Sequence, residues 1–189
     1  TPNRFHAAAC DHYFVAVLHE FPETAEQAIQ EVKAKYDFDE KDLDETTVFN
    51  YLLQSNPGGR VNASVGNIAA GEELSDETFE SEFHDGYVAH ATIETHAAVV
   101  KIEDGKATAW VSTQAPFRAQ ESLGEELGFT LENVRIITPF VGGGFGGKSP
   151  HRQAVEAARL AKITGKPVMV AWDRKEEFFY DTYRPAAVV

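Results

Sequence analysis

The stretch from residue 134 to residue 149 reads VRIITPFVGGGFGGKS, with five glycines among residues 142–147. Its first four residues predict a strand, and an alanine-rich helix is predicted at 152–162. Glycines between a strand and a helix leave the backbone free of side chains. Backbone N–H groups can then approach an anionic or oxo-bearing ligand, with the positive end of the helix behind them. This stretch therefore decides both the local fold and the candidate site.

Outward from this loop, the chain alternates strands and helices and contains one hairpin. Strands are predicted at 13–18, 34–38, 107–112, 134–137 and 168–171, with an extended stretch at 87–102. Helices are predicted at 22–32, 46–54, 117–127, 152–162 and 174–179. The Asp104-Gly105 pair predicts a tight turn between the stretch 87–102 and the strand 107–112. Because a hairpin interrupts the alternation, the predicted fold class is α+β, with mixed sheets, packed helices and two subdomains.

The predicted boundary between the subdomains lies within residues 59–71, after the turn signal Asn56-Pro57-Gly58-Gly59. Residues 1–70 are expected to form an N-terminal α/β subdomain. Residues 71–189 are expected to form the subdomain that carries the glycine-rich loop 142–148. The chain has neither an initial methionine nor a leader and starts in domain-like sequence, so it is expected to be a fragment of a longer protein.

Charge and cysteine content limit the classes of partner. Thirty acidic residues against seventeen basic ones give a formal net charge of −13. Such a charge argues against a nucleic-acid or anionic-membrane partner. No apolar run approaches the roughly 20 residues that a membrane-spanning helix needs. The single cysteine, Cys10, cannot by itself hold an iron–sulfur cluster or build a disulfide framework.

Two nucleotide-binding patterns also fit the loop. Gly142 to Ser149 satisfies the phosphate-loop pattern G-x-x-x-x-G-K-S letter for letter. However, Pro150 falls in the first turn of the helix that should begin at the lysine, and only about forty residues follow. Gly142, Gly144 and Gly147 satisfy the shorter pattern G-x-G-x-x-G, but the acidic residue expected about 20 positions later is missing. A tight structural turn without a ligand is the remaining alternative.

Other segments, in order along the chain, decide between these interpretations. They are HATIET at 90–95, STQ at 112–114 followed by Pro116, Gly128 followed by VRI at 134–136, VGGGFGGK at 141–148, and KPV at 166–168 followed by DRKEEF at 173–178. Together they resemble the molybdenum-binding subunit of the molybdenum hydroxylases, the family of xanthine dehydrogenase, aldehyde oxidoreductase and isoquinoline 1-oxidoreductase. The loop is similar to that family's loop in every letter, whereas HATIET lacks both prolines and the methionine of the family's segment. Because five ordered segments are more specific than one glycine pattern, this resemblance is preferred over a phosphate loop at 142–149.

The resemblance implies an oxidoreductase that hydroxylates an N-heteroaromatic compound or an aldehyde with oxygen derived from water. The redox chemistry would belong to a molybdenum ion held by a molybdopterin-type cofactor, with the cytosine dinucleotide as one form of it. Gln114 would bond the apical oxo ligand of molybdenum through its amide. Gly143, Gly144 and Gly146 would let backbone N–H groups approach the cofactor, and Phe145 would both contact the cofactor and form an apolar wall beside the substrate.

Two departures from the family's pattern bear on substrate and activity. Xanthine-oxidising members carry a glutamate directly after the loop lysine, where this chain has Ser149. Ser149 is therefore expected to line the pocket of a substrate other than a purine, as in the isoquinoline branch. The family's catalytic glutamate lies near the far end of the subunit, beyond this chain, so no catalytic residue is expected here. The isolated chain is expected to be inactive and to bind the cofactor weakly or not at all.

The same resemblance implies three partners. They are the remainder of the large subunit, an iron–sulfur subunit or domain that carries electrons away, and the small-molecule substrate. Neither the sequence nor the resemblance indicates a cellular compartment.

Two polar clusters have simpler interpretations. If 87–102 is a strand, one of its faces carries zinc-ligand residue types, namely His90, Glu94 and His96, with His84 as a fourth. A polar strand face packed against a neighbouring segment is the favoured interpretation, so no metal site is assigned. The charge run from Arg174 to Glu177 is interpreted as a solvated helix start with ordinary salt bridges.

Overall fold

The computed structural model describes residues 6–11, 14–35, 37, 42–55, 58 and 60–189. The chain divides into two compact units, one comprising Thr1–Asp37 and His90–Thr182, the other Phe38–Ala89 and Tyr183–Val189. Each unit is thus assembled from two separate stretches of sequence. The predicted division into subdomains of residues 1–70 and 71–189 stays a prediction.

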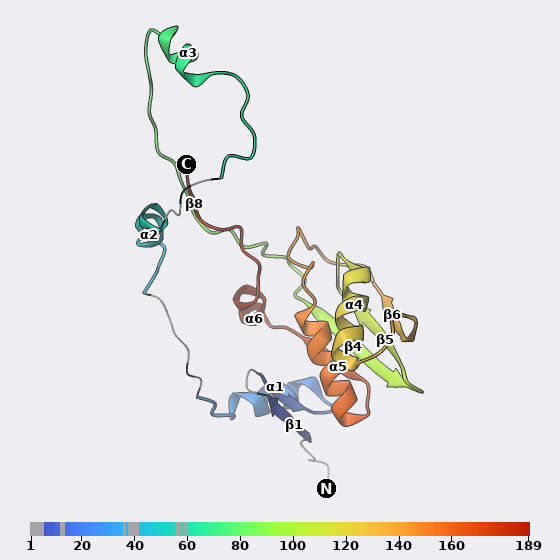
Figure 1. Cartoon of the computed structure of the whole chain (residues 1–189). Coiled ribbons are helices and arrows are strands. Elements are labelled where there is room, and N and C mark those ends of the chain that lie inside the picture. The colour runs from blue at the N-terminus through green and yellow to red at the C-terminus, as the bar shows by residue number, and fades with distance from the viewer. Residues whose placement is uncertain (1–5, 12–13, 36, 38–41, 56–57, 59) are drawn as a thin grey trace. The chain divides into compact units, whose positions relative to one another are not determined.

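The first unit is built on a four-stranded sheet in the order β6-β5-β4-β7 (Figure 1). Its strands are β4 (Ala97–Glu103), β5 (Lys106–Val111), β6 (Val134–Ile137) and β7 (Val168–Ala171). β5 pairs antiparallel with β4 and parallel with β6, and β7 pairs antiparallel with β4. The predicted hairpin turn is confirmed, since Asp104 and Gly105 have φ angles of 48° and 72°. The mixed sheet agrees with the predicted α+β class.

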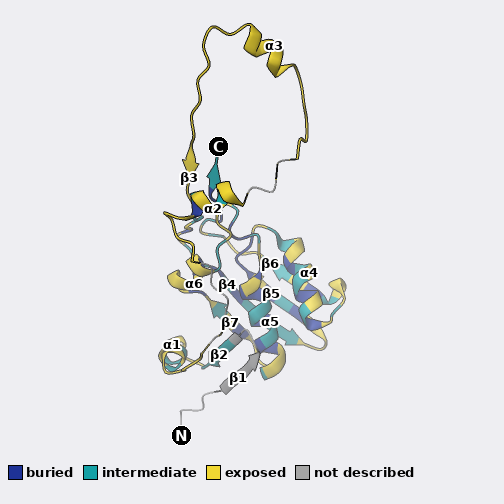
Figure 2. Ribbon diagram, turned by 60° about the vertical axis from the view of Figure 1, so that its left-hand side comes forward, coloured by how far each residue is buried: buried dark blue, intermediate teal, exposed yellow. Residues whose placement is uncertain are grey.

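Two helices cover one face of this sheet (Figure 2). α4 (Pro116–Leu127) connects β5 to β6, and α5 (Arg152–Thr164) connects β6 to β7. Each helix ends at a glycine in the left-handed conformation, Gly128 after α4 and Gly165 after α5. Both predicted helices are confirmed, and α5 extends two residues beyond the predicted end.

The hydrophobic core lies between these helices and the sheet. Alternate strand residues face the helices, as the period of two along a strand requires. The core members are Ala98, Val100, Ala107, Ala109, Val111, Leu123, Leu127, Val134, Ala154, Ala157, Ala158, Leu160, Ala161 and Val168. The alanines of α5 let its backbone lie close to the sheet, which fixes the segments that enter and leave this layer.

Shorter elements complete the first unit. They are β1 (His6–Asp11), β2 (Phe14–Leu18), α1 (Pro22–Gln30), the 3-10 turn η1 (Leu131–Asn133) and α6 (Arg174–Phe179). β1 and β2 form an antiparallel pair, and Ala16 and Leu18 of β2 pack against the core. α6 begins with a capping box in which Asp173 and Glu176 bond each other's backbone N–H. In the predicted strand 34–38, residues 34, 35 and 37 are irregular, and residues 36 and 38 lie outside the described part.

The second unit contains α2 (Val48–Gln54), α3 (Ile68–Glu73), β3 (His84–Asp85) and β8 (Ala187–Val188). β3 and β8 pair antiparallel, so the C-terminal stretch is tied to the middle of the chain. The helix predicted at 46–54 is confirmed as α2, whereas β3, β8 and α3 were not predicted. Within the described residues, no helix has the length and apolar content needed to cross a membrane.

The expected extended stretch 87–102 is only partly confirmed. β4 begins at Ala97, and residues 89–96 form no strand. Ala91 has a φ of 47°, which breaks the extended conformation. The side chains of this segment therefore leave the backbone in several directions and not on one common face.

The core predicts a clear contrast between two positions on α4. Leu123 is completely buried, whereas Phe117 on the same helix is exposed. Leu123→Ala should lower the free energy of unfolding by about 3 kcal/mol, since it removes apolar contacts and leaves a cavity. Phe117→Ala should change it by less than about 0.5 kcal/mol. Urea denaturation of the two variants checks this, and equal effects would contradict the described packing.

Candidate functional site

The site lies where four segments leave the sheet at the same edge. β5, β6 and β7 run parallel to one another, and β4 runs against them. The segments after β5, β6 and β7 therefore emerge beside the segment that enters β4. These segments are residues 112–116, 138–148, 172–177 and 90–96. In open sheets with parallel strands, this carboxyl edge is the usual place for a ligand.

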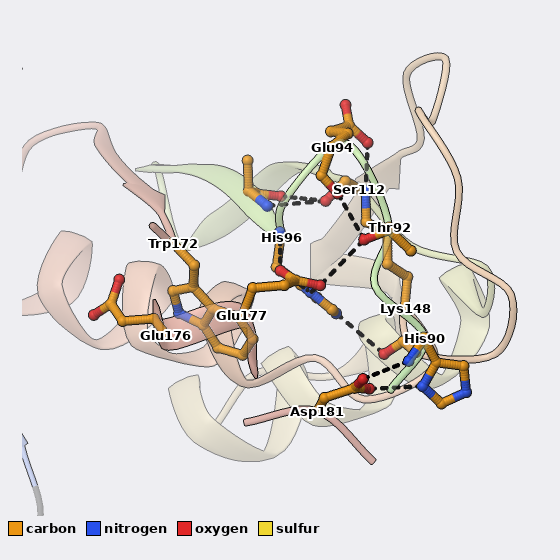
Figure 3. A network of polar contacts seen from close by, with 12 residues as sticks. His90, Thr92, Glu94, His96, Ser112, Lys148, Trp172, Glu176, Glu177 and Asp181 are labelled. Carbon is orange, nitrogen blue, oxygen red and sulfur yellow. Dashed lines mark hydrogen bonds and ion pairs between the residues drawn. The ribbon is translucent and has the colours of Figure 1, made fainter. Parts of the chain in front are cut away.

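One carboxylate closes the glycine-rich loop, here defined as residues 142–148. Glu94 Oε2 accepts hydrogen bonds from the backbone N–H of Gly142 at 2.9 Å and from Lys148 Nζ at 2.5 Å (Figure 3). The backbone N–H of Glu94 donates to the Gly142 carbonyl at 3.3 Å. Because Gly142 and Lys148 are the first and last residues of the loop, Glu94 fixes both of its ends.

The end of the loop is also bound to the segment after β5. The Lys148 carbonyl accepts from the backbone N–H of Gln114 at 3.0 Å and from Thr113 Oγ1 at 3.2 Å. Ser112 Oγ bonds the backbone of Ala97 at the start of β4. The predicted STQ segment and the predicted loop are thus in direct contact, and both are tied to the sheet.

A buried histidine–glutamate pair supports the loop from the inside. His96 Nδ1 lies 2.9 Å from Glu177 Oε2, and His96 Nε2 lies 3.1 Å from the Gly147 carbonyl (Figure 3). Glu177 also accepts the backbone N–H of His96 at 2.8 Å. Both ring nitrogens of His96 therefore face oxygen acceptors, which holds the ring between Glu177 and the loop. The ring of Trp172 packs on His96 with 4.7 Å between centroids.

The charge run 174–177 is therefore not a simple solvated helix start, and that interpretation is wrong. The Glu177 side chain is buried. The Arg174 guanidinium donates to the carbonyls of Thr92 and Ile93, both at 2.7 Å. One turn of α6 thus holds the segment 90–96 with a cation and an anion. The charge run resembles that of a surface helix because Lys175 and Glu176, which lie between Arg174 and Glu177, are exposed.

The loop glycines make room for side chains of this same chain. An added Cβ at Gly142 would lie 2.7 Å from Glu94 Cβ, and one at Gly144 would lie 2.6 Å from Gln114 Cδ. At Gly146 and Gly147, an added Cβ would lie 3.0 Å and 3.1 Å from atoms of His90. These glycines are thus required by Glu94, Gln114 and His90 as well as by the positive φ of 114° at Gly146.

The loop nevertheless leaves a row of backbone donors free. Within the described part of the chain, the N–H groups of Gly143, Gly144 and Phe145 have no hydrogen-bond partner. The N–H of Gly146 donates to Gln114 Oε1 at 2.9 Å. This bond uses the acceptor of the Gln114 amide and leaves its two Nε2 donors unpaired among the described residues. Three backbone donors and one side-chain NH₂ group therefore have no partner within the described residues.

The two side chains expected to line a substrate lie at this loop. Phe145 has a φ of 52° and is 77% exposed. A φ in this range is uncommon for a bulky residue and costs of order 1 kcal/mol or more, so the surrounding bonds must impose it. Ser149 is half-buried, and its N–H donates to the Gly146 carbonyl at 3.2 Å. The predicted contacts Gln114, Gly143, Gly144, Phe145 and Gly146 thus lie together around one loop.

The zinc hypothesis rested on a strand that the structure does not contain. His90, Glu94 and His96 each face a different partner, namely Asp181, Lys148 and Glu177. His84 belongs to the second unit and pairs with Glu82. In the part of the chain that is described, no group of three or more His, Cys, Asp or Glu residues could hold a metal ion.

The phosphate-loop alternative is also contradicted by the position of its lysine. In such a loop, the lysine ammonium reaches the phosphates of the nucleotide. Here Lys148 is completely buried and paired with Glu94. α5 begins only at Arg152, after Pro150, so the loop does not lead directly into the helix. The letters of the pattern match, but the lysine ammonium is bound to Glu94 and not free for a phosphate.

The sequence did not indicate two buried acids, Glu177 and Asp181. Asp181 accepts from His90 Nδ1 at 2.6 Å and from the His90 backbone N–H at 2.7 Å. The local sequence offers no signal for them, since the neighbouring Phe178 and Phe179 are themselves exposed. A buried carboxylate needs a partner, and here the partners His90 and His96 lie more than 80 positions away.

The environment of Glu94 lowers the pKa of its carboxyl from the usual 4.5. Partial burial acts in the opposite direction and raises it. Hydrogen bonds from Lys148 and from the Gly142 N–H, with the charges of Lys148 and His96, outweigh that effect. A lowered pKa in the folded state means that the ionised carboxylate stabilises the fold.

This linkage gives a pH-dependent prediction for Glu94→Gln. The stabilisation is fully present above pH 4.5 and is lost as the pH falls through the lowered pKa of the folded state. At pH 7 the variant should lose about 1–3 kcal/mol of unfolding free energy. This is less than for a fully buried pair, because the Glu94 side chain is 39% exposed. Denaturation curves from pH 7 to pH 3 measure the difference, which should shrink below pH 4.5.

Glu103→Gln is the matched control for this experiment. Glu103 pairs with Lys101 at 2.7 Å, but both side chains are exposed. Its removal should change stability by less than about 0.5 kcal/mol at any of these pH values. An effect of Glu94→Gln that is absent at pH 7, or equally large at pH 3, would show that the Glu94–Lys148 bond does not stabilise the loop.

Comparison with known proteins agrees with this geometry. The model of the family described as "Molybdopterin cofactor-binding domain" matches residues 52–189. Xanthine dehydrogenase/oxidase of Gallus gallus is 33% identical over 173 residues, which are 88% of this chain and 12% of that protein. The aldehyde oxidoreductase molybdenum-binding subunit PaoC of Escherichia coli (strain K12) is 31% identical over 185 residues, 94% of this chain and 25% of that subunit. The chain therefore spans a quarter or less of the length of these relatives.

A solved structure shows the same fold. Quinoline 2-oxidoreductase from Pseudomonas putida 86 superimposes with a TM-score of 0.68 at 24% sequence identity. The superposition covers 88% of this chain and 22% of that one.

Proposed function

Because this chain belongs to the family of molybdopterin cofactor-binding domains, we propose that it forms one wall of the cofactor site in an oxidoreductase of the molybdenum hydroxylase type. The intact enzyme would hydroxylate an N-heteroaromatic compound or an aldehyde with oxygen derived from water. The observation that supports this proposal is the row of free donors at the glycine-rich loop. The bound molybdenum cofactor supplies the redox chemistry, and the protein supplies binding and orientation.

The available donors fit such a cofactor. Within the described residues, the N–H groups of Gly143, Gly144 and Phe145 are unpaired, and among the backbone N–H groups of this loop the Glu94 carboxylate accepts only from the preceding Gly142. A molybdopterin is rich in oxygen and nitrogen acceptors, and consecutive backbone donors on a glycine-rich loop suit anionic or oxo-bearing groups. Gly143 has a φ of 97°, which residues with a side chain rarely adopt, so the position of its N–H depends on glycine.

Gln114 and Gly146 act as a pair in this proposal. The Gly146 N–H occupies the Gln114 Oε1 atom. The amide is thereby held through its oxygen, and its Nε2 donors remain for an oxygen acceptor of the cofactor. A neutral donor orients such an oxygen without protonating it.

Phe145 and Ser149 are assigned to the substrate side. The exposed Phe145 ring offers an apolar face to an aromatic or aldehyde substrate. Ser149 stands where the resemblance places a purine-binding glutamate in xanthine-oxidising members. A serine hydroxyl offers no carboxylate to a purine, which favours a quinoline-like heterocycle or an aldehyde.

We further propose that the rest of the enzyme lies outside this chain. This rest comprises the remainder of the large subunit with the catalytic glutamate, and an iron–sulfur subunit or domain that receives electrons. The cytosine dinucleotide form of the cofactor is part of the same proposal. Exposed apolar side chains near the loop, Ile93 and Phe140, would be covered by that remainder.

The first test uses the full-length enzyme purified with its partner subunits. The wild-type complex should contain about one molybdenum and one pterin per large subunit. The double variant Gly143→Ala, Gly144→Ala should lose both, because a methyl group at position 144 collides with Gln114 and one at position 143 is strained by the φ of 97° there. Gln114→Ala should lower turnover about 100-fold, the scale for losing one oriented donor. Gln30→Ala, at an exposed position of α1, is the control.

Elemental analysis, pterin fluorescence and steady-state rates give the result. A wild-type complex without molybdenum, and with magnesium-dependent binding of ATP or GTP, would refute the proposal.

The second test concerns the 189-residue chain alone. It should show no turnover of aldehydes or N-heteroaromatic compounds with a dye as electron acceptor, and little or no bound pterin. The reason is that only one wall of the site is present. A melting transition shows that the chain is folded, and any turnover above background would contradict the prediction.

A further inference from the structure

A second polar group borders the glycine-rich loop, on the side of Gly146 and Gly147. It is the couple of His90 and Asp181 (Figure 3). His90 Nδ1 lies 2.6 Å from Asp181 Oδ1, and the His90 backbone N–H donates to Asp181 Oδ2 at 2.7 Å. Both oxygens of the carboxylate are therefore committed to one histidine.

This arrangement fixes the imidazole and leaves one nitrogen free. The Asp181 side chain is only 4% exposed, so its charge is held in place by His90. A carboxylate that faces Nδ1 keeps the proton on that nitrogen. His90 Nε2 has no hydrogen-bond partner among the described residues, and the His90 side chain is 23% exposed. The free nitrogen is thus oriented and accessible.

The free nitrogen lies against the loop. A Cβ built at Gly146 would be 3.0 Å from His90 Nε2 and 3.5 Å from Cδ2. Gly147 lies under the other half of the same ring, 3.1 Å from Cγ by the same measure. The N–H of Gly146 holds the Gln114 amide. His90 Nε2 and the Oε1 atom of the Gln114 amide therefore both border the residue Gly146.

A purely packing role does not require this chemistry. A leucine or phenylalanine would fill the space over two glycines without a buried charge. A buried carboxylate is costly to desolvate and is retained where its hydrogen bonds matter. Here the carboxylate's recorded bonds all serve to orient the histidine.

We propose that His90 is a binding residue of the cofactor site, whose Nε2 forms a hydrogen bond with a polar ring atom or phosphate oxygen of the bound molybdopterin. Asp181 is the positioning residue that orients the imidazole. The inference rests on the proposed function, since it takes the ligand to be this cofactor. It adds a side-chain contact on the opposite flank of Gly146 from Gln114.

The experiment uses the full-length enzyme with its partner subunits. His90→Phe keeps a ring over the glycines and removes the nitrogen, whereas His90→Gln places a polar atom near Nε2. Asp181→Asn keeps the acceptor for the backbone N–H but removes the charge. Molybdenum and pterin per large subunit are measured before and after extended gel filtration. Melting temperatures are taken on forms produced without molybdenum.

We expect His90→Phe to retain cofactor about tenfold less well than the wild type, the scale of one lost hydrogen bond. His90→Gln should recover most of that loss, and Asp181→Asn should fall between the two. His84→Phe is the control, because His84 is also carboxylate-paired and its recorded partners, Glu82 and Phe49, lie outside the loop.

The outcomes separate the two proposals. A wild-type complex that lacks molybdenum and pterin refutes the proposed function itself. A loaded wild type with an equally loaded His90→Phe variant leaves the proposed function standing and overturns the role of His90. A loss that His90→Gln does not restore, or one that accompanies a lower melting temperature of the cofactor-free form, also overturns it, since His90 would then only pack against the loop.

Discussion

The two bonds of the Glu94 carboxylate, one to each end of the glycine-rich loop, are the constraint on which the site depends. A loop with five glycines has more conformational freedom than almost any other segment and loses more entropy when it is ordered. It has few side chains of its own that could compensate for this loss. The carboxylate binds the N–H of Gly142 and the buried ammonium of Lys148, so an electrostatic contact supplies what packing cannot. The strained φ of Phe145 persists between these two fixed points.

The sheet makes this contact possible. Residues 90–96 and 142–148 are distant in sequence, but the first segment enters β4 and the second follows β6 at the same edge of the sheet, with β5 between the two strands. The buried pair of His96 and Glu177 connects a third segment, α6, to the loop. His96 bonds Glu177 through one ring nitrogen and the Gly147 carbonyl through the other. The loop is therefore bonded at Gly142, Gly147 and Lys148. Between these points, the N–H groups of residues 143–145 have no partner among the described residues.

Much of this structure followed from local sequence patterns, and the failures have one physical origin. The strands β6 and β7, the helix α6 and the Asp104-Gly105 turn were predicted with their limits, because short-range periodicity and turn chemistry determine them. The set of loop residues came from resemblance and remains a prediction as a cofactor site. At the site, the predictions that failed were those for the segment 90–96 and for the charge run of α6. Their conformation is set by bonds between residues more than 80 positions apart, such as His96–Glu177 and Arg174–Thr92, which no local pattern reports.

The fit between each loop glycine and a distant side chain has an evolutionary consequence. Gly142 faces Glu94, Gly144 faces Gln114, and Gly146 and Gly147 face His90. A methyl group at Gly142 or Gly144 collides with Glu94 or Gln114, and one at Gly146 or Gly147 crowds the His90 ring. A larger residue at one of these glycines is therefore tolerated only if the side chain that faces it becomes smaller. The motif should be inherited as coupled pairs, and grafting the glycine-rich string alone into another protein would transfer its letters without its shape.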